Sequence, residues 1–344
     1  MRILITSLAL FLMSIVGTGS KHLTAESKAG ARISAVENWS CAFGGKELTL
    51  HFRVENNKPA EGRLLWHYSA NQRTLARGES EIKPNDDSTA EVVLRVPEVR
   101  DGVIYRTNLA VAFVQPDGNI ENATLSKTLW LFPEDPFTDQ REALKERQLS
   151  LFDPEGRTAE LFEKISLPHQ QIQNVASLAD HTRHSYVIVG EGTSLIRHRG
   201  LAEQLLSFAA TGGTVLMLAP SEGIIPMPER ADADRPGELR FRRHHVIRDF
   251  DKRLDSISWP GISGLPGSKI SLRTRLGQIG MELSDDGDWS WLTIEYPETN
   301  GRFVFCGFSL VEHWDSGPTP RYLLARILIP ETKNDVPASR FDED

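Results

Sequence analysis

One short stretch of the sequence could present a nucleophilic serine. Ser221 lies in Ala-Pro-Ser-Glu-Gly, residues 219–223, which is similar to the Gly-x-Ser-x-Gly turn between a strand and a helix. His313 could act as the base, with Asp315 as the acid that orients it. Residues 224–228 contain two prolines, however, and these oppose the helix that such a turn requires. The pattern therefore favours a surface loop, and a serine hydrolase is the alternative.

Further polar residues follow the predicted buried strands and could bind a ligand. Open parallel sheets bind ligands beyond the carboxyl ends of their strands, so polar residues there are expected to converge. The segment 190–194, Gly-Glu-Gly-Thr-Ser, could cradle an anion with its N–H groups. It is neither the dinucleotide fingerprint nor a Walker loop, and a plain strand-to-helix turn is favoured. Asp153 is also an alternative acid for His313. The ligand-binding candidates are Asp153, Glu191, Gly192, Glu222 and Glu312.

These candidates depend on a predicted β-α-β unit that organises the C-terminal half. Residues 186–189 and 214–218 are continuous apolar runs, which are typical of buried strands, and residues 201–210 between them predict a helix. That helix is expected to end at Gly212-Gly213. The other predicted elements are strands at 149–152, 171–175, 239–248, 289–296 and 303–308, and helices that start near residue 158 and span 320–329.

Three segments of this half resemble the class I glutamine amidotransferase-like fold. They are Leu-Phe-Asp-Pro-Glu-Gly-Arg-Thr-Ala at 151–159, Tyr-Val-Ile-Val-Gly-Glu-Gly at 186–192, and Gly-Gly-Thr-Val-Leu at 212–216. A β-sandwich followed by such a domain resembles, more narrowly, the C-terminal non-catalytic region of some family 2 glycoside hydrolases and related secreted bacterial proteins. The resemblance implies an α/β flavodoxin-like open sheet in residues 148–330.

The resemblance also implies that this domain lacks the nucleophile of its catalytic relatives. Those relatives place a cysteine on the turn after the strand that residues 214–218 would form, and this chain has Ala219 near that position. Glutaminase or cysteine-hydrolase chemistry needs a thiolate there. The late His-x-Glu of amidotransferases is replaced by Glu-His-Trp-Asp at 312–315. We therefore expect a degenerate, non-catalytic domain.

The N-terminal half, residues 31–133, predicts an all-β sandwich of the immunoglobulin-like type. Apolar and polar residues alternate at 48–54, 90–96 and 109–113, as in strands with one buried face. Turn residues about ten positions apart separate these runs. Aromatic residues of this half could form a sugar platform, although burial in the core is favoured. They are Trp39, Trp66, Tyr68, Tyr105 and Trp130.

Segments with other functions flank these two domains. Arg2 precedes an apolar run and a group of small residues, which predicts a signal peptide and lead-in at 1–25 and export to the periplasm or the extracellular space. An uncleaved membrane anchor is the alternative. A charged linker or short helix is expected at 134–147, and an acidic disordered tail at 331–344.

The sequence predicts neither a metal nor a cofactor. Cys41 and Cys306 lie in or beside apolar stretches, so two buried thiols are favoured over a disulfide, and two isolated cysteines give no metal-binding pattern. His244 and His245 are expected on a strand, where neighbouring side chains point to opposite faces and cannot easily share one ion.

The net charge and the lengths of the apolar runs argue against some classes of partner. The net charge of -8 argues against nucleic acid, because phosphate binding needs a basic surface. No apolar run after the N-terminal one reaches the ~20 residues of a membrane-spanning helix. With the resemblance above, the expectation is an exported, non-catalytic accessory or binding protein whose partner is a glycan or another extracytoplasmic protein. The alternatives are a secreted hydrolase with a serine or carboxylate site, and a structural oligomerisation module.

Overall fold

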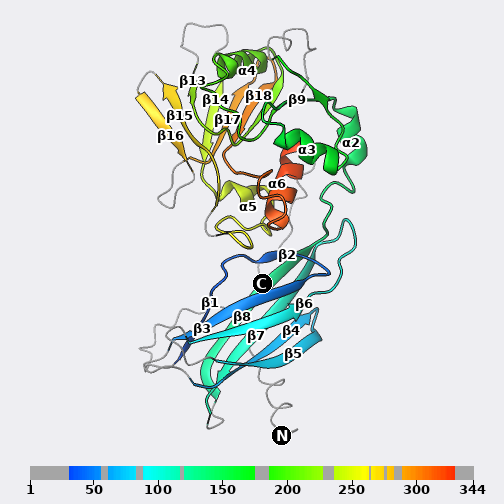
Figure 1. Ribbon diagram of the computed structural model, residues 1–344, viewed down its shortest axis with the longest axis vertical. Helices are drawn as coiled ribbons and strands as arrows, with labels where there is room; N and C mark the ends of the chain where they lie inside the picture. The colour runs from blue at the N-terminus through cyan, green and yellow to red at the C-terminus, as the bar shows by residue number, and fades with distance from the viewer. Residues whose placement is uncertain are drawn as a thin grey trace. The chain divides into compact units, whose positions relative to one another are not determined.

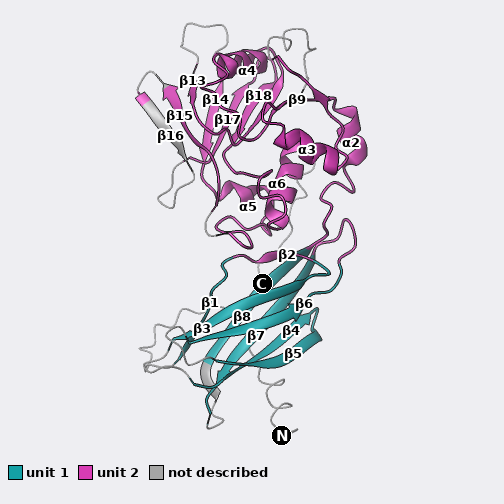
Figure 2. Cartoon of the chain, viewed as in Figure 1, with its two compact units in different colours: residues 1–38, 44–98, 105–131 teal, residues 39–43, 99–104, 132–344 magenta. Residues whose placement is uncertain are grey.

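The computed structural model describes the chain as two compact units, which Figure 2 distinguishes by colour. The described residues are 31–55, 61–82, 88–116, 120–174, 186–227, 236–262, 265–274, 277–282 and 289–329. The predicted signal peptide and acidic tail lie outside them. Unit 1 takes its described residues from 1–38, 44–98 and 105–131, and unit 2 from 39–43, 99–104 and 132–344.

Unit 1 is built from antiparallel β-sheets (Figure 1). Its strands are β1 (Arg32–Ala35), β3 (Glu47–Glu55), β4 (Arg63–Ala70), β5 (Arg73–Glu81), β6 (Thr89–Arg95), β7 (Tyr105–Val114) and β8 (Ile120–Phe132). One sheet has the order β1-β3-β6, and the other contains the neighbours β8-β7-β4-β5. The predicted alternation is confirmed in β3, where Leu50, Phe52 and Val54 are buried while Thr49 and Arg53 are exposed.

The aromatic residues of unit 1 differ in their burial. Tyr68 is completely buried and belongs to the core, as its apolar body favours. Trp66 is half-buried, and its indole packs so closely over Gly78 that a Cβ there would overlap the ring. Tyr105 and Trp130 are also half-buried, and the guanidinium of Arg106 lies 5.7 Å from the ring centroid of Trp130.

The main sheet of unit 2 contains a run of parallel strands. Its order is β10-β9-β11-β12-β18-β17-β14, and the first five of these run parallel to one another. The strands are β9 (Leu149–Phe152), β10 (Gln170–Gln171), β11 (Tyr186–Val189), β12 (Thr214–Leu218), β14 (Glu238–Arg242), β17 (Trp291–Tyr296) and β18 (Gly301–Cys306). The buried runs of β9, β11 and β12 confirm the strands predicted from their apolar sequences.

Smaller elements complete unit 2. A second sheet has the order β13-β15-β16, formed by β13 (Ile224–Pro226), β15 (Lys269–Thr274) and β16 (Gly277–Glu282). The short strand β2 (Cys41–Phe43) also belongs to this unit. The helices are α2 (Arg141–Glu146), α3 (Arg157–Lys164), α4 (Leu201–Ala210), α5 (Val246–Phe250) and α6 (Pro318–Leu328). The predicted helix at 201–210 is confirmed with the same bounds.

Helix α4 packs closely on the main sheet (Figure 1). Leu205 and Ala209 are completely buried in the core that α4 shares with β12 and β18. Gly301, the first residue of β18, lies directly against the helix, so that a Cβ there would overlap the carbonyl oxygen of Ala209. A residue without a side chain is therefore required where the helix and the strand approach each other.

Several predicted elements have other bounds than the observed ones; β18 and α6, for example, each begin two residues earlier than expected. The strand expected at 239–248 ends at Arg242 as β14, and His244 and His245 lie in a turn that leads into α5. The strand expected from residue 289 begins at Trp291, so Trp289 precedes it. The weak strand expected at 171–175 corresponds to β10, which begins one residue earlier, at Gln170, and contains only two residues. Tertiary packing sets these bounds, and local propensity does not.

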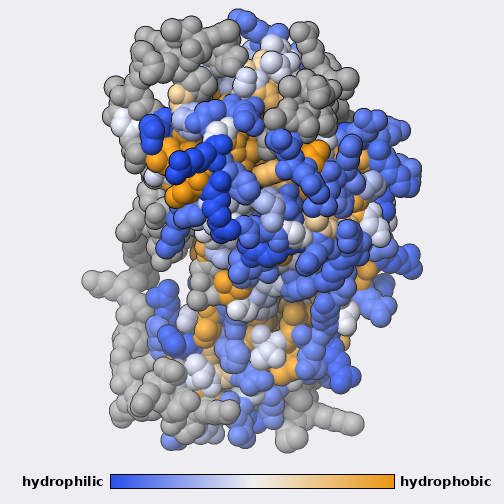
Figure 3. Space-filling model, turned by 45° about the horizontal axis from the view of Figure 1, so that its top comes forward, coloured by the Kyte–Doolittle hydropathy of each residue, from blue (hydrophilic) through white to orange (hydrophobic). Residues whose placement is uncertain are grey.

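The described surface is mixed in hydropathy. On the face drawn in Figure 3, hydrophobic residues reach the surface in separate patches among hydrophilic ones. No helix among the described residues is long and apolar enough to cross a membrane. The fold is that of a β-rich chain with several sheets and two units.

Candidate functional site

The polar candidates of the α/β half follow the carboxyl ends of neighbouring parallel strands. Asp153 comes directly after β9, Glu191 follows β11, Glu222 follows β12, and Glu312 follows β18. Because these four strands are adjacent and parallel, their carboxyl ends lie on one edge of the sheet. This edge, which we call the strand-end edge, is the candidate functional site.

Glu191 is the most deeply buried carboxylate of the strand-end edge, with 2% of its surface exposed. The backbone N–H of Val311 donates to its Oε2 at 2.8 Å, and that of Glu312 donates to its Oε1 at 2.9 Å. Burial raises the pKa of Glu191 to about 7, although these two hydrogen bonds and the charge of Arg157 lower it. Both carboxylate oxygens are thus engaged by the protein's own backbone.

The carboxylate of Asp153 accepts a hydrogen bond from the first turn of helix α3. Its Oδ2 accepts a hydrogen bond of 2.8 Å from the backbone N–H of Ala159, which is one of the free donors of the first helical turn. Its Oδ1 is buried without a hydrogen-bond partner and packs against Gly190, where a Cβ would overlap it. The side chain is 4% exposed, so Asp153 serves the packing of α3 against the end of β11.

Gly192 occupies a backbone position that a side chain would disturb. Its φ of +85° lies in the left-handed region, and a Cβ there would overlap the guanidinium of Arg157. Its N–H donates to the carbonyl of Ala219 at 2.9 Å, which joins the turns after β11 and β12. Gly192 therefore shapes this edge and places the exposed Arg157 beside it.

Ser221 and Glu222 lie on the surface after β12. Both are exposed, and the backbone N–H of Ser221 donates to the carbonyl of Thr193. The carboxylate of Glu222 accepts a hydrogen bond of 2.7 Å from the hydroxyl of Ser194. The Ala-Pro-Ser-Glu-Gly stretch leads into β13, so a strand follows where a nucleophile turn would begin a helix.

His313 and Asp315 are placed in separate surroundings. The ring of His313 lies edge-on to Trp259, with the centroids 6.3 Å apart. The carboxylate of Asp315 pairs with Arg321 at 2.7 Å and with Lys164 at 3.3 Å. The hydrogen bonds of the described residues therefore give His313 neither Ser221 nor Asp315 as a partner, and the arrangement of a triad is not assembled here.

Ala219 and the two cysteines decide whether thiol chemistry is available. Ala219 is buried, and its N–H donates to the carbonyl of Cys306 at 2.7 Å. Burial raises the pKa of Cys306 to about 12, and burial together with the neighbouring Asp255 raises the pKa of Cys41 well above its usual value. Both thiols are free and buried, so neither supplies an accessible thiolate.

The described residues contain no group of three or more side chains that could hold a metal ion. His244 and His245, which attract attention in the sequence, have ring centroids 6.1 Å apart in nearly perpendicular planes. Burial and the neighbouring charges of His245 and Arg243 lower the pKa of His244. The nearby Arg242 pairs with Asp249, as a basic edge with acidic neighbours would.

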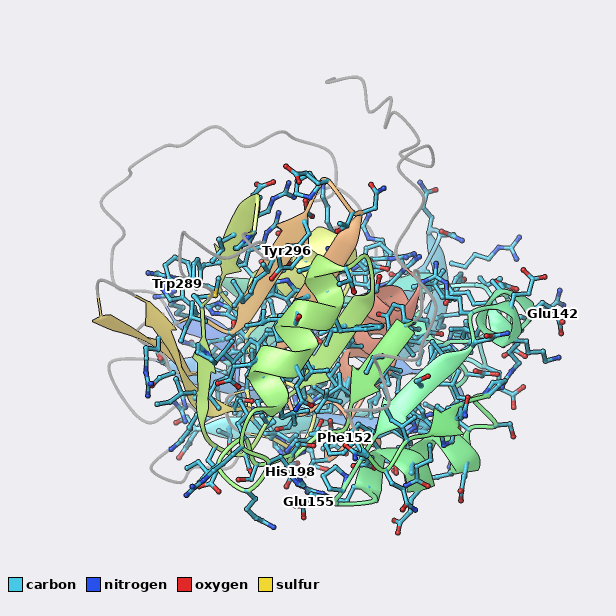
Figure 4. All side chains as sticks on the ribbon, turned by 90° about the horizontal axis from the view of Figure 1, so that it is seen from above. Glu142, Phe152, Glu155, His198, Trp289 and Tyr296 are labelled. Atoms are coloured by element: carbon cyan, nitrogen blue, oxygen red, sulfur yellow. The ribbon has the colours of Figure 1, made fainter. Side chains whose placement is uncertain are left out.

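Several contacts at the strand-end edge were not predicted from the sequence. Thr158 is completely buried, and its hydroxyl accepts a hydrogen bond from the N–H of Glu191. Phe152, Glu155 and His198 lie close together in Figure 4. The rings of Phe152 and His198 meet edge-on at 5.4 Å, and Glu155 pairs with Arg197 at 3.2 Å. These contacts connect β9 and the loop that follows it to the loop after β11, and no local sequence pattern predicts them.

Comparison with known proteins assigns no family to this β-rich chain. No protein-family model and no curated protein matches it. Among solved structures, it matches the sporulation control protein Spo0M from Bacillus subtilis with a TM-score of 0.24 and 12% identity, covering 35% of this chain and 56% of that one. A chain from the complex of zinc 2-glycoprotein and prolactin inducible protein from human seminal plasma matches with a TM-score of 0.22 and 9% identity, covering 32% and 99%. AvmM, which catalyses macrocyclization in alchivemycin A biosynthesis, matches with a TM-score of 0.20 and 10% identity, covering 33% and 96%. Similarity this low carries no argument about fold or function.

Proposed function

We propose that this chain is an exported, non-catalytic binding or accessory protein. Its N-terminal half is an immunoglobulin-like sandwich, and its C-terminal half is a degenerate amidotransferase-like domain with a flavodoxin-like sheet. The strand order supports the second assignment, because β10-β9-β11-β12-β18 corresponds to 2-1-3-4-5 when these parallel strands are numbered along the chain. The sequence resemblance of residues 151–159, 186–192 and 212–216 supports it independently.

The observation that carries the proposal is the internal use of the polar groups at the strand-end edge. Glu191 accepts two backbone hydrogen bonds, Asp153 holds the start of α3, and Ala219 stands where catalytic relatives carry cysteine. A general acid or base must reach the proton that it transfers, and a buried, doubly hydrogen-bonded carboxylate does not offer that access. The edge is therefore better suited to binding than to turnover.

The exposed groups of the same edge favour a particular class of ligand. Ser221, Glu222 and Glu312 present a hydroxyl and two carboxylates to solvent, and Arg157 adds a cationic donor. Such donors and acceptors match the hydroxyl groups of a carbohydrate. Together with the resemblance to non-catalytic regions of glycoside hydrolases, they favour a glycan as the partner, with another extracytoplasmic protein as the other candidate.

Binding to an array of bacterial and plant polysaccharides, followed by calorimetry, tests the proposal. We expect the full chain to retain at least one glycan without hydrolysing it. Glu312→Gln and Arg157→Ala should weaken that binding severalfold, whereas Glu142→Gln, an exposed change on α2, should leave it unaltered. Retention of no glycan, or equal binding by all variants, would count against a glycan site at this edge.

A further inference from the structure

The strand-end edge continues past β18 to β14, the last strand in the order of the main sheet. Since β17 runs antiparallel to both β18 and β14, these two strands point in the same direction, and the carboxyl end of β14 lies on the same edge. Arg243 follows β14 directly, and Trp289 lies just before β17, which begins at this edge. The two residues therefore lie on the edge that carries the polar candidates of the parallel strands.

Arg243 and Trp289 form a cation–π pair, and backbone hydrogen bonds fix the segments that carry it. The guanidinium of Arg243 lies 5.4 Å from the ring centroid of Trp289. The N–H of Ser290 donates to the carbonyl of Arg242 at 3.1 Å, which joins the residues next to the pair. The N–H of Gly307 donates in turn to the carbonyl of Ser290 at 2.9 Å. The ends of three strands thus support the pair, as a precise binding group requires.

The indole of Trp289, labelled in Figure 4, combines a fixed position with a partly accessible surface. The residue is half-buried, and it packs on the hydrophobic core of unit 2 together with Phe241, whose ring centroid lies 5.6 Å away. An indole has negative π faces, which attract the polarised C–H groups of a sugar ring. Trp289 can therefore contact a sugar without leaving its place against the core.

The guanidinium of Arg243 is exposed and keeps its hydrogen-bond donors available. No hydrogen bond or ion pair to another described residue occupies this side chain, and the acids of the same segment are engaged elsewhere. Glu238 pairs with Arg240, and Asp249 pairs with Arg242. An arginine that stacks on an aromatic ring still offers the edge of its planar fork to a carboxylate.

The charge around this pair contrasts with that of the whole chain. Residues 238–249 contain four arginines and two acids, a surplus of two positive charges, although the net charge of the chain is -8. Burial and the charges of His245 and Arg243 lower the pKa of His244, so this half-buried ring is uncharged at neutral pH and adds a hydrogen-bonding group only. A local surplus of cations on an acidic protein favours an anionic ligand.

We propose that Arg243 and Trp289 bind an acidic sugar, in which the carboxylate of a uronic acid pairs with the guanidinium and the sugar ring lies against the indole. The inference rests on the proposed function, since it names the class of glycan that the strand-end edge receives. Glu222 and Glu312, after β12 and β18, are carboxylates that accept from hydroxyl groups and repel an anion. The acidic sugar unit is therefore expected at the β14 end of the edge.

Paired polysaccharides separate this inference from the proposed function. Polygalacturonate, alginate and hyaluronan are each tested with the full chain beside their carboxyl-reduced forms, in which the uronic acids have become neutral sugars, at about 0.15 M salt. We expect at least one acidic form to bind about tenfold more tightly than its reduced form, because the charge-assisted pair is lost on reduction. Equal or tighter binding of the reduced forms would overturn the inference and leave glycan binding intact. Binding of neither form would overturn both.

Two variants with the same change of charge test the role of Arg243. Arg243→Gln should weaken the binding of the acidic form about tenfold and change that of the reduced form by less than about twofold. Arg73→Gln, an exposed change on β5 of unit 1, removes the same charge and should leave both affinities unaltered. Equal losses in the two variants would reveal a diffuse attraction of polyanions and would overturn the assignment to Arg243.

The indole N–H signal of Trp289 gives a readout that needs no variant. In NMR titrations with an oligosaccharide of the acidic polysaccharide that binds most tightly, this signal should shift and saturate with the Kd found by calorimetry. Dextran sulfate, a polyanion without carboxylates, should cause a much smaller shift. An unchanged Trp289 signal at saturation, or an equal shift with dextran sulfate, would overturn the inference.

Discussion

The carboxylate of Asp255 binds Cys41, a residue 214 positions earlier in the chain, through both its backbone and its side chain. The N–H and the thiol of Cys41 each donate to Oδ2 at 2.8 Å, and the N–H and hydroxyl of Ser40 donate to Oδ1 at 2.7 Å. Thr319 of α6 completes the group, because its hydroxyl accepts from the N–H of Asp255 and lies 3.3 Å from the thiol. The backbone and the side chain of Asp255 together thus link three distant segments of unit 2.

Loss of the Asp255 carboxylate should destabilise the protein strongly. Asp255→Asn replaces one of two acceptor oxygens by a donor, which would leave the N–H and the side-chain donor of either Ser40 or Cys41 without an acceptor. Each such buried group costs about 1–3 kcal/mol. Chemical denaturation should show a loss of roughly 2–4 kcal/mol, whereas Asp249→Asn, at an exposed ion pair, should change the free energy of unfolding by less than about 0.5 kcal/mol. Equal effects of the two variants would contradict the role assigned to Asp255.

Gly301→Ala should disrupt the contact between α4 and β18. The new methyl group would overlap the carbonyl oxygen of Ala209, and neither the helix nor the central strand can yield easily. We expect a loss of about 1–3 kcal/mol or more in thermal or chemical unfolding. Gly156→Ala is the matched control: its Cβ would meet no atom within 4 Å, so only the backbone conformation at φ +78° is tested, at a cost of about 1–2 kcal/mol. A Gly301 variant as stable as the unaltered chain would show that the helix can shift.

The two cysteines should resist modification in the native protein. Both thiols are completely buried, and burial raises the pKa of each, so the reactive thiolate is scarce at neutral pH. Incubation with iodoacetamide at pH 8 should leave both unmodified until denaturant is added, after which mass spectrometry should find two alkylated residues. Rapid alkylation of Cys306 in the native state would reopen thiol chemistry beside Ala219.

Replacing the hydroxyl of Ser221 should leave the stability of the protein unchanged. The side chain is exposed, so Ser221→Ala should shift the free energy of unfolding by less than about 0.5 kcal/mol. A panel of ester and glycoside substrates should give no turnover above background with either form. Turnover by the unaltered chain that Ser221→Ala or His313→Ala abolishes would establish the hydrolase alternative in place of the binding function.

The sequence predicts the buried parallel strands well and the site poorly. The apolar runs of β11 and β12 have no other stable place than the centre of a sheet, and helix α4 between them ends at two glycines as expected. The use of Glu191 could not be foreseen, because its partners at 311 and 312 are backbone N–H groups that carry no sequence signal. The same holds for Cys41, whose apolar neighbours predict burial but whose partner Asp255 lies 214 positions away.

Each unit is made of several separate stretches of the chain, and this limits how the gene can recombine. Unit 2 takes residues 39–43 and 99–104 from within the N-terminal half, and Asp255 engages the first of these pieces. A gene fragment that begins at the linker near residue 134 would encode unit 2 without the backbone that Asp255 binds. A single recombination event at that linker therefore cannot transfer an intact unit 2 to another protein, and we expect the two halves to be gained or lost together.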